Sequence, residues 1–312
     1  MTRRAGGWGT PILLTLVAAL FSIIGPGLLI FVPFALLLLA LPPRRPMLLV
    51  AAAALLFVGI SGGSSDMLWW FGRGWALILG SWFVTMVALM PRASFMDRSV
   101  GAVAATVGTA AILLVVGQAG FEQLDYTIDQ RLHRSAAAFA AALTARQDTT
   151  GEAVALSTQL AASFNRAADL QALLFPGLLA IASVAGLAVA FWAWRRFALQ
   201  DEQPFRRLRE FRFRDELVWV LVAAILLIVL PLDGGASRAG ANLITFMGAL
   251  YALRGLAVMI ALFGAPGPLG VVFGALMLLF LFPMVLATTL MVGLSDTWLD
   301  LRARARGSST GA

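Results

Sequence analysis

Long apolar runs joined by short polar turns constrain this chain more than any other feature. The clearest run is Gly240–Gly264, whose roughly 25 residues would form a helix of about 37 Å, longer than the bilayer hydrocarbon core of about 30 Å. Similar runs recur at Ile12–Leu41, Met47–Ile60, Met67–Met90, Val100–Gly117, Leu173–Trp194, Leu217–Leu232 and Leu269–Leu294. We therefore predict an all-α, polytopic membrane helix bundle with eight or nine apolar segments.

The charge content supports the membrane class. The chain is 60% hydrophobic and 12% charged, whereas soluble domains carry roughly 25% charged residues. The net charge of +7 arises mainly in short loops, as the positive-inside rule predicts for a multi-pass protein. We expect the inner (cytoplasmic) membrane of a bacterium, a lipid bilayer as partner and no nucleic acid.

Two points of topology stay open at this stage. Ile12–Leu41 is interrupted by Gly25-Pro26-Gly27, so it is either one kinked segment or two short helices. The arginine-rich segment Arg195–Glu216 predicts the cytoplasmic side. Three further crossings would then place the C-terminal tail outside, yet the tail is itself basic. We favour an inside tail, with one of the last segments re-entrant.

The one sizeable polar part, 118–171, predicts an extramembrane helical hairpin inserted in a single integral membrane domain spanning 1–312. Apolar residues recur there with helical spacing on either side of a break at Gln147–Gly151. The acidic and basic residues of this part nearly balance, which favours the non-cytoplasmic side.

The residues argue against an enzyme. The chain has no cysteine and one histidine, His133, which lies between Arg131 and Arg134. No histidine–carboxylate cluster with metal-ligand spacing stands out, so we expect no metal and no cofactor. Gly59-Ile60-Ser61-Gly62-Gly63 fits G-x-S-x-G, but a base for the serine is missing nearby, and we interpret it as a flexible turn.

The residue most in need of explanation is Arg254, within an apolar run. A guanidinium at membrane depth costs roughly 2.5–3.5 kcal/mol on insertion scales. Either it pairs with a carbonyl or an acidic side chain of another helix, or it binds a carboxylate or phosphate in a central cavity. Asn242 and Tyr251 of the same run, and Arg73 in Met67–Met90, complete the candidate ligand-binding set. Small-residue pairs that would allow close helix packing occur at Gly248-x-x-x-Ala252 and Gly270-x-x-x-Gly274.

The C-terminal third resembles a known family. The matching stretches are Asn242-Leu243-Ile244, Leu253-Arg254-Gly255-Leu256-Ala257-Val258, Pro283, and the run from Gly293 to Arg302 that includes SDTWLDLR. They resemble the YybS-like family of predicted bacterial membrane proteins, whose members look like the substrate-binding S components of energy-coupling-factor transporters. The resemblance implies small-molecule binding or transport, with a transporter module or another membrane protein as partner. The family usually has a glutamine-like residue where this chain has Arg254. The alternative function is a scaffold or assembly factor that acts through the 118–171 hairpin.

Overall fold

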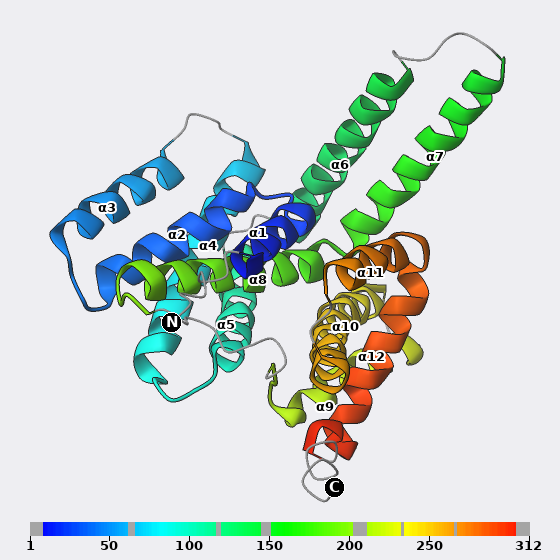
Figure 1. The fold of residues 1–312 in the computed structure, drawn as a ribbon. Coiled ribbons are helices and arrows are strands. Elements are labelled where there is room, and N and C mark those ends of the chain that lie inside the picture. The colour runs from blue at the N-terminus through cyan, green and yellow to red at the C-terminus, as the bar shows by residue number, and fades with distance from the viewer. Residues whose placement is uncertain are drawn as a thin grey trace, which may run out of the picture. The chain divides into compact units, whose positions relative to one another are not determined.

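The computed structural model describes residues 9–61, 66–116, 120–144, 151–201, 211–231, 234–264 and 267–303. Within these ranges all regular structure is helical, and the chain forms two compact units, residues 1–200 and 201–312. Figure 1 shows the helices by colour and label. The helices of the first unit are α1 (Gly9–Phe21), α2 (Pro26–Ala40), α3 (Pro46–Ile60), α4 (Met67–Leu89), α5 (Phe95–Val116), α6 (Phe121–Thr144), α7 (Gly151–Leu173) and α8 (Phe175–Phe197).

Helix α8 forms the centre of the first unit. It is rich in alanine, glycine and other small residues, and most of its side chains are buried against α1, α2 and α5. At Gly186 the backbone of α2 lies so close that a methyl group would meet the Leu29 carbonyl oxygen at 2.7 Å. The Trp75 indole donates a hydrogen bond to Ser183 Oγ at 3.0 Å, which ties α4 to α8.

The apolar segment Ile12–Leu41 is two helices, separated at Ser22–Gly25. Pro26 is the first residue of α2, where its missing N–H costs no hydrogen bond. Helices α6 and α7 pack against each other, and Figure 1 shows this pair extending away from the other helices of its unit. The extramembrane position of 118–171 and the single-domain assignment of 1–312 stay predictions.

The second unit contains the 3₁₀ turn Asp215–Leu217 and helices α9 (Val218–Val229), α10 (Gly234–Phe263), α11 (Pro268–Phe280) and α12 (Phe282–Leu299). Helices α9 and α10 run antiparallel, with Gly240 against Ala224 and Ile228. The apolar run Leu269–Leu294 contains two helices, since α11 ends at Phe280 and α12 begins with Phe282.

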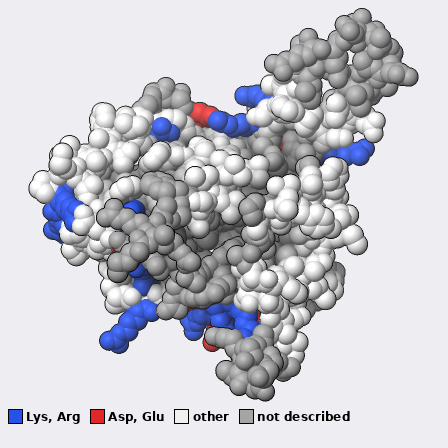
Figure 2. Space-filling view, viewed as in Figure 1, with Lys and Arg blue, Asp and Glu red and all other residues white. Residues whose placement is uncertain are grey.

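Within the described ranges, five helices are long and apolar enough to cross a membrane: α4, α5, α8, α10 and α12. The predicted count of eight or nine segments is therefore not supported. Helices α1, α2, α3, α9 and α11 have 12 to 15 residues, which gives roughly 18–23 Å at 1.5 Å per residue. Large apolar side chains are exposed along α1, α3, α5, α9 and α11, and Figure 2 shows a mostly uncharged surface with arginines in a few groups. Such a surface suits contact with lipid.

Candidate functional site

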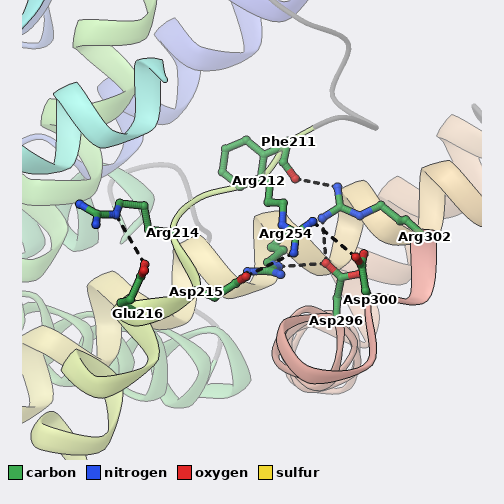
Figure 3. A network of polar contacts seen from close by, with 9 residues as sticks. All are labelled: Phe211, Arg212, Arg214, Asp215, Glu216, Arg254, Asp296, Asp300 and Arg302. Atoms are coloured by element: carbon green, nitrogen blue, oxygen red, sulfur yellow. Dashed lines mark hydrogen bonds and ion pairs between the residues drawn. The ribbon is translucent and has the colours of Figure 1, made fainter. Parts of the chain in front are cut away.

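The second unit contains a buried ionic network centred on Arg254 (Figure 3). Arg254 Nε donates to Asp296 Oδ2 at 3.0 Å, and Arg254 Nη1 donates to Asp215 Oδ1 at 2.7 Å. The side chains of Arg254 and Asp296 are both fully buried, whereas that of Asp215 is 42% exposed. The Arg254 guanidinium also lies 5.3 Å from the centre of the Phe213 ring. Arg254 therefore binds acidic side chains from two other segments of its unit.

Arg302, at the start of the C-terminal tail, also belongs to this network. Helix α12 ends at Leu299, and Asp300 follows in the left-handed conformation with φ of 42°. This bend turns the chain back, so Arg302 Nη2 donates to Asp296 Oδ2 at 2.7 Å and Arg302 Nη1 donates to the Phe211 carbonyl at 2.9 Å. The start of the tail thus lies beside the end of the predicted cytoplasmic segment Arg195–Glu216.

The charges in this network balance. Arg212 pairs with Asp215 at 3.2 Å and with Asp300 at 3.7 Å. Three arginines (212, 254 and 302) therefore meet three aspartates (215, 296 and 300). Among the described residues this set is neutral, which leaves little net positive charge for an anionic ligand. It neutralises the charges that the unit buries, as pairing does for ionisable residues in membrane helices.

Two polar atoms of the network have no hydrogen-bond partner among the described residues, Arg254 Nη2 and Asp296 Oδ1, and both are buried. A buried polar atom without a partner costs about 1–3 kcal/mol. The geometry therefore favours the interpretation that Arg254 pairs with acidic side chains of other segments. Arg254 Nη2 and Asp296 Oδ1 stay without a partner among the described residues.

Two glycines allow the network to form. Helices α10 and α12 cross with their backbones in contact, because a methyl group added at Gly255 would overlap the Thr289 carbonyl, and one at Gly293 would overlap the Tyr251 carbonyl. This contact brings Arg254 and Asp296 within hydrogen-bond distance. The predicted small-residue pairs do not form this closest approach, since Gly248 makes only an ordinary contact with Leu290 of α12 and Gly274 of α11 has open space beside it.

The other predicted ligand-binding residues have local partners. Tyr251 is fully buried and packs edge-to-face on Phe213 at 5.1 Å. Asn242 Nδ2 donates to the Arg238 carbonyl one turn earlier on α10. Arg73 belongs to the first unit, where its guanidinium lies 3.7 Å from the Trp69 ring centre and donates to the Ser61 carbonyl at 3.3 Å. The structure thus brings Tyr251 next to Arg254 and gives Asn242 and Arg73 contacts of their own.

The first unit contains a pocket that sequence reasoning missed. It has a volume of about 300 Å³ and lies where the end of α1 meets α6, α7 and the start of α8. Its lining is Leu20, Phe21, Ser22, Ile23, Arg131, Leu132, Ser135, Gln171 and Leu178. Arg131 also contacts Asp66 at 3.9 Å, with both side chains about half exposed. The sequence offered no signal for it, because its residues come from four segments far apart in the chain.

Sequence reasoning also missed a cluster of His133 with two aspartates. His133 Nε2 on α6 lies 3.4 Å from Asp129 Oδ1 and 3.2 Å from Asp169 Oδ1 on α7. The four-residue spacing of Asp129 and His133 was a usable signal, but the approach of Asp169 depends on how α7 packs against α6. Of the motif Gly59–Gly63, the last two residues lie outside the described part, and Ser61 follows the end of α3.

Comparison with known proteins gives a family. A model of the family described as "predicted membrane protein (DUF2232)" matches residues 11–297. No curated protein and no solved structure matches the chain. Since the match covers most of its length, the chain belongs to this family of predicted membrane proteins.

Proposed function

We propose that this protein is a non-enzymatic, multi-pass membrane protein that binds a small amphipathic anion in the pocket between α1, α6, α7 and α8. The observation that carries the proposal is the pocket itself, because its volume of about 300 Å³ reaches the lower end of the range for ligand sites. Its role would be transport-related, as for a substrate-binding component in the inner membrane.

The lining of the pocket defines the ligand class. Arg131 supplies a permanent positive charge and several donors. Gln171 offers an amide, Ser135 offers a hydroxyl that donates to the Arg131 carbonyl, and Leu20 and Leu178 add apolar surface. The ion pair of Arg131 with Asp66 is long and solvent-exposed, so it is weak and a ligand carboxylate or phosphate can compete with it. Arg254, by contrast, already has two acidic partners.

The experiment is native mass spectrometry of the full chain, purified in detergent, with a thermal-shift screen of small carboxylates and organic phosphates. We expect wild type to hold a bound small molecule or to be stabilised by one of the anions. Arg134→Gln is the matched control and should behave as wild type does, because the Arg134 side chain bonds Gln130 on the same helix instead of lining the pocket. Arg131→Gln and Ser135→Phe, which removes pocket volume, should abolish binding. An empty wild type that none of these anions stabilises would refute the proposal.

A scaffold function acting through 118–171 is the second proposal, and one observation favours it. Helices α6 and α7 have 24 and 23 residues and expose Phe121, Tyr126 and Phe139. Replacing residues 143–159 by a short Gly/Ser linker would shorten this pair and retain the pocket. Loss of co-purifying membrane proteins with ligand binding intact would support the scaffold, whereas an unchanged set of co-purifying proteins would count against it.

A further inference from the structure

The helix pair α6–α7 places three metal-ligating groups together. Asp129, His133 and Asp169 each offer one ligand atom, and these atoms all lie within 4.8 Å of one another. Asp129 and His133 are one turn apart on α6, while Asp169 comes from the facing helix α7. Both carboxylates approach the same imidazole nitrogen, Nε2, at 3.4 and 3.2 Å.

The spacing suits a first-row divalent ion better than it suits a hydrogen-bonded triad. Ligand atoms about 2.0–2.2 Å from such an ion are roughly 3.3–3.6 Å apart when neighbours in a tetrahedral shell, and the two distances to Nε2, 3.4 and 3.2 Å, are close to this range. A single N–H on Nε2 points well at only one acceptor, so it cannot serve both carboxylates well. A cation in place of that proton bonds all three atoms.

The charge and the solvent exposure of these three side chains also suit a divalent cation. Two carboxylates and a neutral imidazole neutralise a divalent cation. The nearest arginines along α6 have other partners, since Arg131 contacts Asp66 and Arg134 bonds Gln130. The side chains of His133, Asp129 and Asp169 are 37%, 45% and 67% exposed, so water can reach the site and complete the coordination shell.

We propose that Asp129, His133 and Asp169 form a binding site for a first-row transition metal ion such as Zn²⁺, with three protein ligands and water. The imidazole ligand disfavours Mg²⁺ and Ca²⁺, which take oxygen ligands. The ion links the middle of α6 to the C-terminal part of α7. The proposal does not depend on the anion pocket, because the two share no residue.

The chain allows a clean test, because it has one histidine and no cysteine. Full-length protein without a polyhistidine tag, labelled with ¹⁵N-histidine and purified in detergent, is titrated with ZnCl₂. We expect one Zn²⁺ per chain by calorimetry, a large shift of the His133 Nε2 resonance, and a weaker response to MgCl₂.

Variants distinguish Zn²⁺ binding at this site from non-specific electrostatic attraction of Zn²⁺ to the helix pair. His133→Gln and Asp169→Asn should each weaken Zn²⁺ binding by roughly a hundredfold or more, since each removes a ligand. Glu122→Gln removes one negative charge from the same helix and should bind as wild type does. Zn²⁺ binding that leaves the His133 resonance unshifted, binding unchanged in both ligand variants, or no stoichiometric binding by wild type would each overturn the proposal.

Discussion

Arg254 of α10 and Asp296 of α12 form a fully buried ion pair, with Nε and Oδ2 3.0 Å apart. Asp296 Oδ2 also accepts from Arg302, so one carboxylate oxygen accepts hydrogen bonds from two arginines. Removing a partner of such a pair leaves an uncompensated charge in a medium that solvates it poorly. The pair is therefore the most sensitive point of the second unit.

Asp296→Asn should destabilise the protein by about 3–5 kcal/mol, the usual cost of breaking a buried ion pair. Asp215→Asn should cost less, about 1 kcal/mol, because the Asp215 side chain is 42% exposed and water screens its charge. Thermal or denaturant unfolding of both variants in the same detergent checks the ranking. Equal losses would show that burial does not set the strength of these contacts.

Gly255→Ala and Gly293→Ala should each destabilise the protein by about 3 kcal/mol or more, because the added methyl group meets backbone that cannot move aside. Gly274→Ala is the matched control on α11, where nothing lies within 4 Å of the new methyl group; it should be neutral or slightly stabilising. The same unfolding measurement checks all three. A Gly255→Ala protein as stable as wild type would contradict the backbone contact between α10 and α12.

In the first unit, Ser183→Ala should cost about 1–3 kcal/mol, since it leaves the buried Trp75 indole N–H without its acceptor. Thr127 of the predicted extramembrane hairpin offers the contrast, because its hydroxyl donates to the Gln123 carbonyl at an exposed position, where water can replace the hydroxyl. Thr127→Ala should therefore change the free energy of unfolding by less than about 0.5 kcal/mol. The two substitutions are compared by thermal unfolding.

The contact between Arg302 and the Phe211 carbonyl predicts that the tail and the end of the basic segment lie on one side of the membrane. Because the native chain has no cysteine, Ala303→Cys and Glu216→Cys each give a unique label site. Both should react with an impermeant maleimide only from the cytoplasmic side, whereas Ala137→Cys on α6 should react from the other side. Labelling of Ala303→Cys and Glu216→Cys from opposite sides would refute this topology.

Much of this architecture could be predicted from local pattern. Apolar periodicity predicted both helices of the 118–171 segment, and Gly25-Pro26 marked a break that separates two helices. The isolated arginine in an apolar run predicted that Arg254 needs a partner. These features depend on residues close together in sequence, and local backbone chemistry decides them.

What could not be predicted depends on packing between distant segments. Asp215 belongs to the arginine-rich segment that predicted the cytoplasmic side, yet it binds Arg254 at 2.7 Å. Gly255 and Gly293 were not among the predicted small-residue pairs, and each lies against a carbonyl of the other helix. The number of spanning helices was overestimated for a different reason, since apolar runs of 12 to 15 residues carry the composition of a span without its length.

The order of the partners along the chain has a consequence for synthesis. Asp215 precedes Arg254 by 39 residues, whereas Asp296 follows it by 42. At about 5–20 residues per second, the ribosome takes roughly 2–8 s to make Asp296 after Arg254. During that interval Asp215 is the only one of these two acidic partners already made, so it can pair with Arg254 while α10 enters the bilayer. The buried pair with Asp296 forms later.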